Sequence, residues 1–359
     1  MKYLEKNYIL FCCICLLITC KNNQQDGKNP DAIETYTVTP DHAELLSSDL
    51  EPLETPESSV RKSVNIAIGY GGIVVSWENP TKAEIGVRLM VKDDGRMIEK
   101  EMYFSSKALE KRAFRGFESV ETSFALTFED KWGNISDTVY FTGTPILEVE
   151  VPKPWSDLRA MIPYDNTSEL SGYQFYKTWD NVVAMNNRYL SDNGSMGSSV
   201  TFDLRQVVKL SRMILWPRIL GQFDAIEEIY GQVQMLEFEM WGIKKLDPSR
   251  LPPTGNKSYW LHPFSVAQTG QTLPAHTFMN DWVYLGRHQV ERLDLMGASL
   301  EDIAVQGRAG FHFEISNACG PVRIIRLFPI ATMDGTPPPM NYWQIAELSF
   351  FGDNTVPQD

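Results

Sequence analysis

The residue types that most often carry catalysis or bind metals are sparse in this sequence of 359 residues. It contains five histidines, and no two of them stand at a spacing typical of metal ligands. No Gly-x-Ser-x-Gly motif is present to hold a nucleophilic serine. Carboxylates are plentiful, since Asp and Glu together number 46, so a glycosidase pair stays open as an alternative. The sequence therefore gives little support to catalysis.

Cysteine chemistry is concentrated at the N-terminus. The apolar run from Tyr8 to Ile18 is shorter than the stretch of about 20 residues that spans a bilayer, and it suits the core of a secretory signal. The run ends in Leu-Ile-Thr-Cys at Cys20, which resembles a bacterial lipobox, and polar residues follow at once. We expect residues 1–19 to be a lipoprotein signal and Cys20 to carry the lipid; an ordinary signal peptide and an N-terminal helix are the alternatives. The mature chain then keeps one thiol, Cys319, and forms no intramolecular disulfide.

The amino-acid composition of the chain limits the kinds of molecule that it is expected to bind. The formal net charge of −13 disfavours nucleic acid, whose binding usually needs a basic surface. Phe, Trp and Tyr make up 11% of the chain, and nine of these residues are Trp. With few helices expected, some of these rings are left for exposed loops, where they offer flat faces to sugar rings.

The predicted strands begin after a polar, proline-containing stretch, residues 20–59. We predict this stretch to be a lipidated cysteine and flexible tether. Residues 60–147 alternate short strands and turns. Their predicted strands include Gly72–Trp77, Ile85–Val91, Met97–Phe104, Ser119–Phe128 and Ile135–Thr142. About seven strands at this spacing, without a cysteine pair, predict an immunoglobulin-like or fibronectin-III-like β-sandwich.

A second domain is predicted over residues 148–359, beyond a proline-rich linker. Its predicted strands are Val200–Leu204, Val207–Trp216, Gln232–Trp241, Trp282–Leu285, Phe311–Ile315, Val322–Ile330 and Trp343–Phe351. Long loops and almost no helix between such strands favour a jelly-roll sandwich. The longest loop, Gly242–Asp281, is rich in Pro, Gly and aromatic residues, and we expect function to lie in such loops.

Each domain resembles a known family through several blocks of residues in order. The first carries Gly71–Pro80, Arg115–Phe117 and Glu129–Asp137, and resembles a fibronectin-III-like module of glycan-utilisation lipoproteins of Gram-negative bacteria. The second resembles the F5/8 type C (discoidin) fold, which includes galactose-binding carbohydrate modules. Its blocks are Val200–Leu204, Ile214–Arg218, Leu236–Gly242, Pro321–Leu327 and Ile345–Gly352. The expected fold class is all-β, with a fibronectin-III/Ig-like β-sandwich followed by a discoidin-like jelly-roll β-sandwich.

The second resemblance implies a structural calcium near the ends of that domain. In the family the ligands are turn carbonyls, an Asp of the turn and a Glu of the last strand, which correspond here to Asp180 and Glu347. Such hard oxygen ligands suit calcium. The sequence departs from the family's turn, because Asn181-Val182 replaces Gly-Asp. The alternative is that Asp180 caps a turn and Glu347 pairs with a nearby Arg.

The same resemblance places ligand contacts in the loops that follow this turn. The family's Thr-Arg-Trp becomes Asn-Arg-Tyr here, so Tyr189 is predicted to stack on a sugar while Arg188 donates to its hydroxyls. The long loop adds three further candidates: Tyr259, Trp260 and His262. The alternative is that Tyr189 and Trp260 pack beneath their own loops.

These features predict a non-catalytic carbohydrate-binding lipoprotein of the outer membrane, on the cell surface. It would capture polysaccharide or oligosaccharide for a glycan-uptake system, reach the membrane through its lipid anchor, and have other glycan-uptake lipoproteins as further partners. Nucleic acid is not an expected partner. A structural or adhesion protein that binds a protein partner, and a glycan-active enzyme, are the alternatives.

Overall fold

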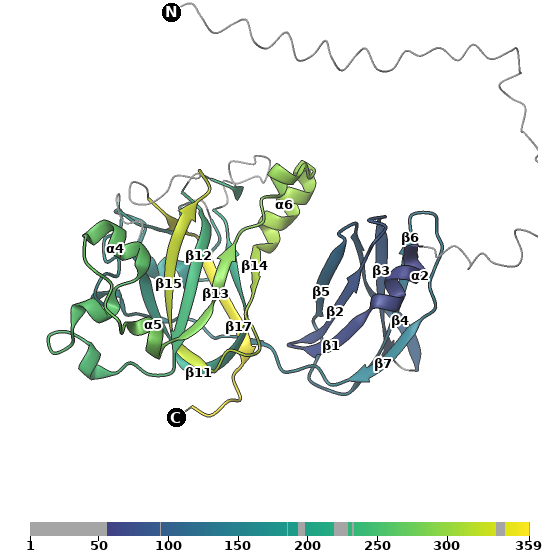
Figure 1. Cartoon of the computed structure of the whole chain (residues 1–359), viewed down its shortest axis with the longest axis horizontal. Coiled ribbons are helices and arrows are strands. Elements are labelled where there is room, and N and C mark those ends of the chain that lie inside the picture. The colour runs from purple at the N-terminus through teal and green to yellow at the C-terminus, as the bar shows by residue number, and fades with distance from the viewer. Residues whose placement is uncertain are drawn as a thin grey trace, which may run out of the picture. The chain divides into compact units, whose positions relative to one another are not determined.

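The computed structural model describes residues 56–358 apart from 94, 185, 193–197, 219–228, 232 and 335–341. The predicted lipid site at Cys20 and the predicted signal lie outside these residues. Antiparallel strands dominate the described part and helices are few, which confirms the all-β sandwich class (Figure 1). Within the ranges described, no helix has both the length and the apolar character needed to cross a membrane.

The N-terminal sandwich is built from one short helix and seven strands. In chain order they are α2 (Pro56–Ser63), β1 (Asn65–Gly69), β2 (Gly72–Glu78), β3 (Ile85–Asp93), β4 (Arg96–Ser105), β5 (Leu109–Arg115), β6 (Thr122–Asp130) and β7 (Val139–Gly143). One sheet has the order β1-β2-β5 and the other β4-β3-β6-β7. The predicted strands therefore form, while the finer fibronectin III assignment and the domain boundaries stay predictions.

Alternation of side chains explains the core of this sandwich. Along β3, the buried residues Val87, Leu89 and Val91 alternate with residues that face outward, as period-two geometry requires. Trp77 of β2 is buried and meets Phe128 edge to face, with ring centroids 6.1 Å apart. The helix α2 begins inside the segment predicted as tether, and its Val60 is buried in the same core.

The C-terminal sandwich contains the remaining strands. Its elements outside residues 244–281 are β8 (Val149–Glu150), β9 (Ser156–Asp157), η1 (Arg159–Met161), η2 (Phe175–Trp179), β10 (Tyr189–Leu190), β11 (Val200–Trp216), β12 (Met235–Ile243), β13 (Val283–Gln289), η5 (Leu293–Met296), α6 (Leu300–Ala309), β14 (Phe311–Glu314), β15 (Val322–Thr332), β16 (Gln344–Ile345) and β17 (Glu347–Asp353). The main strand order is β13-β12-β15-β11-β17-β8, with β14 and β9 also paired to β11.

The long strand β11 belongs to both layers of this sandwich. Its first part, from Val200 to Asp203, pairs with β15, and its second part, from Lys209 to Trp216, pairs with β17. The register shifts in between, where Arg205 adopts a positive φ of 66°. Strands that change sheets at such an irregularity form the corners of sandwiches. The two strands predicted for residues 200–216 are thus one bent strand.

The segment expected to be a long irregular loop, Gly242–Asp281, is partly helical. It forms η3 (Pro248–Arg250), η4 (Lys257–Trp260), α4 (Pro263–Thr269) and α5 (Phe278–Asp281). Trp260 and Phe278 are buried together with Phe328 of β15 in a second cluster of this domain. The expectation of almost no helix is wrong here, because the aromatic residues of the segment bury themselves against the sheet and fix short helices over it.

Candidate functional site

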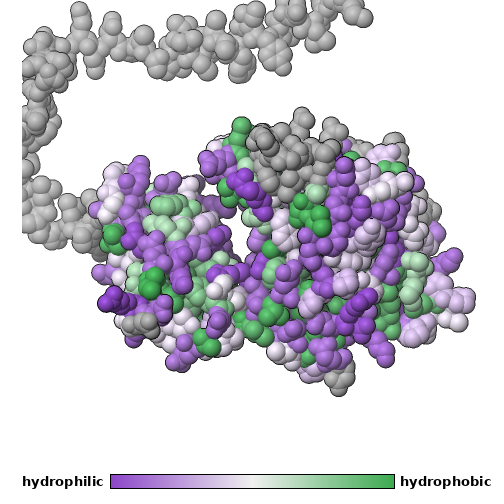
Figure 2. Space-filling model, turned by 180° about the vertical axis from the view of Figure 1, so that it is seen from behind, coloured by the Kyte–Doolittle hydropathy of each residue, from purple (hydrophilic) through white to green (hydrophobic). Residues whose placement is uncertain are grey.

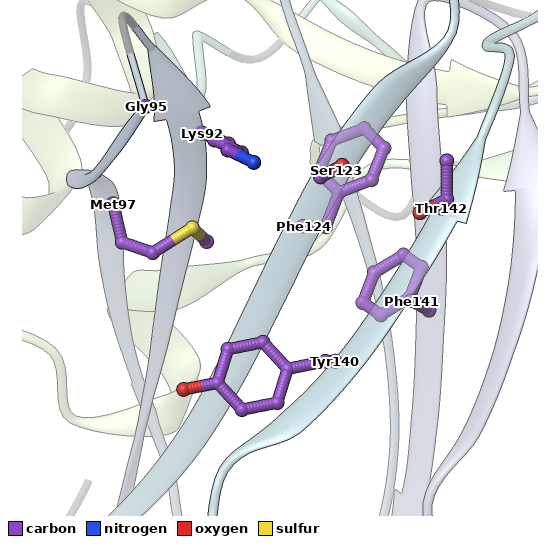
Figure 3. Close-up of a pocket in the computed structure, with 8 residues that line it drawn as sticks. All are labelled: Lys92, Gly95, Met97, Ser123, Phe124, Tyr140, Phe141 and Thr142. Atoms are coloured by element: carbon purple, nitrogen blue, oxygen red, sulfur yellow. The ribbon is translucent and has the colours of Figure 1, made fainter.

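A pocket opens at one end of the N-terminal sandwich. The strands β3 and β6 are paired from Ile85/Asp130 as far as Val91/Phe124, and the register ends there. β3 continues with β4 to Asp93, and β6 continues with β7 to Thr122. The β3–β4 hairpin and the β6–β7 pair thus separate, and a cavity of about 450 Å³ lies between them (Figure 3).

The side chains around this cavity come from all four strands of the sheet. Its lining residues are Lys92, Gly95, Met97, Ser123, Phe124, Tyr140, Phe141 and Thr142. Figure 3 shows Lys92 and Met97 reaching from the hairpin toward the opposite strands, with Tyr140 at the lower rim. The volume lies within the range of small-molecule sites, but the pocket is open to solvent and would enclose only part of a ligand.

Strand alternation explains why Tyr140 is free to meet a ligand. On β7, Val139 and Phe141 pack against the core, so Tyr140 between them must face outward. Tyr140 is 72% exposed and Met97 is 36% exposed. A large aromatic ring is therefore presented to solvent beside an opening whose inner wall contains Phe124.

The polar groups of the pocket can exchange hydrogen bonds with hydroxyls. The ammonium of Lys92 offers three donors, and the hydroxyls of Ser123 and Thr142 can each donate or accept. Ser123 and Thr142 are neighbours in the β6–β7 register. Gly95, with a φ of 78°, closes the hairpin turn at the edge of the cavity. The site therefore combines an aromatic face with hydroxyl-sized polar contacts.

The residues predicted to bind carbohydrate in the C-terminal sandwich are all buried. Tyr189 is 0% exposed, and its hydroxyl accepts a hydrogen bond from Asn166 Nδ2 at 2.8 Å. Burial raises its pKa above the ordinary value of 10.0. The guanidinium of Arg188 is also buried and lies 4.6 Å from the ring centre of Tyr173. These positions favour a structural role for both side chains, and their predicted contact with a glycan stays a prediction.

The other three predicted residues lie close together within residues 244–281. Tyr259 donates to Asp281 Oδ2 at 2.8 Å, and Trp260 donates through Nε1 to the Arg250 carbonyl at 2.8 Å. His262 lies 3.0 Å from Glu239 Oε2 through Nε2. Burial lowers the pKa of His262 and, together with Asp281, raises that of Tyr259. The structure thus brings these three together, whereas Arg188 and Tyr189 belong to different surroundings.

A buried ion pair supports this cluster from the sheet. Arg326 of β15 and Asp165 are both fully buried, and Arg326 Nη2 lies 3.1 Å from Asp165 Oδ1. Arg326 also donates through Nη1 to the Trp260 carbonyl at 3.1 Å. These contacts give Arg326 a structural role.

The two predicted calcium ligands lie near each other, and Glu347 is paired with a lysine. Asp180 caps its own turn, since its Oδ1 accepts from the Val182 amide at 3.0 Å, and it also accepts from Asn187 Nδ2. Glu347 forms a buried ion pair with Lys153. Burial raises the pKa of Glu347, Lys153 acts against this, and the nearby Asp180 acts with it. The turn cap was foreseen as the alternative, but the partner of Glu347 is a lysine and not an arginine.

Sequence reasoning did not single out Tyr140 or Lys92. The available signal was the pattern Val139-Tyr140-Phe141-Thr142, in which an aromatic residue takes an outward position of a predicted strand. The separation of β3 from β6, which creates the cavity, has no comparable signal in the sequence.

Two families of unknown function match the chain. A family described as Domain of unknown function (DUF5126) matches residues 53–154. A second, DUF5000, also described as a domain of unknown function, matches residues 179–352. No curated protein matches the sequence.

Several solved structures are similar to parts or most of the chain. A protein named SusE-like protein BT2857 is 18% identical with a TM-score of 0.44, and the match covers 83% of this chain and 99% of that one. A CBM32-1 of a family 31 glycoside hydrolase from Clostridium perfringens is 13% identical with a TM-score of 0.27, covering 51% and 88%. A family 89 glycoside hydrolase from the same organism is 12% identical with a TM-score of 0.31, covering 59% of this chain and 16% of that one. Similarities of this size do not assign a function.

Proposed function

We propose that this protein binds a glycan without turning it over, and that the pocket between the β3–β4 hairpin and the β6–β7 pair takes part in binding. The observation that carries the proposal is the exposed ring of Tyr140 beside a cavity that also holds Lys92, Ser123 and Thr142. A sugar ring has one flat face of C–H groups and a rim of hydroxyls. Such a ligand needs an aromatic surface and a few nearby hydrogen-bonding groups, and the pocket supplies both.

The visible face of the molecule offers no broad apolar area for a protein partner (Figure 2). On the face in Figure 2, hydrophilic side chains predominate and hydrophobic ones form small separate patches. A stable protein partner usually needs an interface with a fully buried apolar core. Besides Phe124 and Phe141, which pack into the core, the pocket offers the exposed ring of Tyr140, one thioether and three polar side chains, which suits an individual sugar unit of a longer chain.

Binding at one such pocket is expected to be weak. A single ring stack with a few hydroxyl contacts leaves part of the ligand in water, and the ordering of a flexible glycan opposes binding. Several copies of the protein on one membrane would bind one polysaccharide together, which raises the overall affinity without new contacts. A lipid anchor on Cys20 would provide this arrangement.

The remaining parts of the proposal come from the sequence. The lipobox-like end of the N-terminal segment and the two resemblances favour an outer-membrane lipoprotein at the cell surface that captures glycan for uptake. Names such as SusE-like protein among the similar structures agree with that class. The residues Arg188, Tyr189, Tyr259, Trp260 and His262 stay part of the proposal, but as groups that shape the loops of the C-terminal sandwich, since their side chains are buried.

Affinity electrophoresis in gels that contain different polysaccharides tests the proposal, followed by calorimetry with oligosaccharides of any polysaccharide that retards the protein. We expect Tyr140→Ala to weaken binding about tenfold, since the stacking surface is lost. Tyr140→Phe keeps the ring and should stay close to the unaltered protein.

Trp132→Ala is the matched control. Trp132 is an aromatic residue of the same sandwich with 65% exposure, but it follows the far end of β6 and does not line the pocket. It should leave binding unchanged. If no polysaccharide retards the protein, glycan binding is contradicted. If a polysaccharide retards the Tyr140→Ala variant as strongly as the unaltered protein, the pocket is excluded as the site.

The anchor is tested separately in the living cell. Labelling with palmitate should mark the protein and should be abolished by Cys20→Ala, which would also release the protein from the membrane fraction. Labelling that persists in this variant would contradict lipid attachment at Cys20.

A further inference from the structure

The carboxylate of Glu347 is enclosed at the start of β17. Its side chain is 2% exposed, and that of its partner Lys153 is 6% exposed. Glu150 Oε1 lies 3.8 Å from the same Lys153 Nζ, and the ring centre of Trp155 lies 5.7 Å from it. The ammonium therefore stands among two carboxylates and an aromatic ring, next to the turn that contains Asp180.

These residues do not fit a calcium ion. Calcium takes six to eight oxygen ligands at 2.3–2.6 Å. Here Glu347 Oε1 is engaged by the ammonium, and both oxygens of Asp180 accept hydrogen bonds from Asn187. Of these four side-chain oxygens only Glu347 Oε2, which is buried, has no hydrogen-bond partner, and one free oxygen falls far short of a calcium shell. A divalent ion beside Glu347 would also face the positive charge of Lys153 across a few ångströms in a poorly solvated place, where the repulsion is strong.

We infer that the Lys153 ammonium is the resident cation of this place, and that the C-terminal sandwich is stabilised without calcium. An uncompensated carboxylate of Glu347 would be costly at this degree of burial, so a positive charge is required. Lys153 supplies it from the chain itself. The residue precedes β9, so the same contact also holds the start of this sandwich against its last strand.

The burial of the carboxylates decides which of them most needs a positive charge. Glu150 is half exposed and needs little neutralisation, whereas Glu347 is buried and needs one full positive charge. The other polar group of the turn, Asp180, is satisfied by neutral donors of Asn187 and Val182. One ammonium thus neutralises one buried carboxylate.

Two measurements on the unaltered protein test the inference. Its melting temperature should be the same with millimolar calcium and with a chelator. Terbium, used alone as a probe for calcium sites, should show no saturable emission, although the ring of Trp155 lies close enough to sensitise an ion bound there. A melting temperature that rises with calcium, or saturable terbium emission that calcium displaces, would overturn the inference.

Variants of Lys153 provide a second test. Lys153→Met keeps the length of the side chain but removes the charge, and should lower the melting temperature by about 10 °C, with or without calcium. Lys153→Arg keeps the charge and should retain most of the stability. Lys244→Met, at an exposed position after β12, is the control and should change little. A Lys153→Met variant as stable as the control would overturn the inference; if this variant does not fold, the terbium titration of the unaltered protein decides.

Discussion

Tyr140 and Trp260, one aromatic residue from each sandwich, differ completely in their exposure to solvent. Tyr140 lies on β7, at the end of its sheet order, and is 72% exposed. Trp260 lies in the long segment of the C-terminal sandwich and is 1% exposed. It stacks on Phe278 at 6.4 Å, and Phe278 stacks on Phe328 at 5.7 Å. The loop residue is buried and the strand residue is exposed.

This difference shows that the side chains packed around an aromatic ring decide whether the ring is free to bind a ligand. Whether the residue lies in a loop or in a strand does not decide it. The aromatic side chains within 244–281 are close enough in sequence to cluster. Burying them against β15 is more favourable in free energy than leaving them in water. The outward position of Tyr140 follows from the pairing of β7 with β6, which commits Val139 and Phe141 to the core.

The largest expected effect is on stability in the buried cluster. Trp260→Ala should lower the free energy of unfolding by about 3–5 kcal/mol, because it removes a large buried ring and its hydrogen bond to the Arg250 carbonyl. Urea denaturation followed by circular dichroism measures the loss. A loss as small as that of a surface substitution would contradict the burial of Trp260 and restore it as a ligand contact.

The next effect is a loss of stability in acid. Burial lowers the pKa of His262 from 6.5, with Arg326 acting in the same direction and Glu239 against it. The unfolded chain then binds the proton more readily, so stability is full above pH 6.5 and is lost as the pH falls below it, by at most about 1.4 kcal/mol per pH unit for one proton. Residues 60–147 contain no histidine, so this loss belongs to the C-terminal sandwich.

His262→Asn isolates this contribution. Asn retains a group that can cap α4, whose Phe264 amide bonds to His262 Nδ1, but it does not titrate. Denaturation at pH 7.5 and pH 5.5 should show a smaller difference for the variant than for the unaltered protein. Equal differences in the two proteins would assign the acid sensitivity to other groups.

A smaller effect is expected at Tyr189. Tyr189→Phe leaves the buried ring in place and removes the hydroxyl that accepts from Asn166 Nδ2, at a cost of about 1 kcal/mol. Glycan binding should not change. Weaker binding at unchanged stability would instead support the predicted contact between Tyr189 and a sugar.

The smallest effect on stability is expected in the pocket. Tyr140→Ala should change the free energy of unfolding by no more than about 0.5 kcal/mol, since the ring is largely exposed. The same variant should show the reduced glycan binding described above. A large loss of stability would show that Tyr140 supports the sheet, and the comparison with Trp260 would fail.

Much of the fold could be predicted from particular sequence patterns. The alternation in Ile85–Val91 gave the right strand and the right buried face, because period two leaves one choice of face once the core side is known. The break between the two predicted strands marked the position of the kink in β11. The sequence did not indicate that the two form one strand. The short helices in residues 244–281 were missed, because tertiary burial of Trp260 and Phe278 fixes them and local propensity does not.

The candidate site was less accessible to sequence reasoning. Family resemblance directed attention to Arg188 and Tyr189, which the structure places in buried surroundings. Nothing in the order of residues indicates that β3 and β6 separate beyond Val91 and Phe124. A cavity is a property of several strands at once, and the side chains of this one come from residues 92 to 142.

By itself, the sequence determined the all-β class and supplied the prediction of an anchor at Cys20, since both depend on local periodicity and composition. Only the tertiary structure decided that the ring of Tyr140 borders a pocket, that Trp260 is buried, and that Lys153 meets Glu347, 194 residues away. Contacts between residues so distant along the chain depend on how whole sheets pack, and a one-dimensional pattern does not record this.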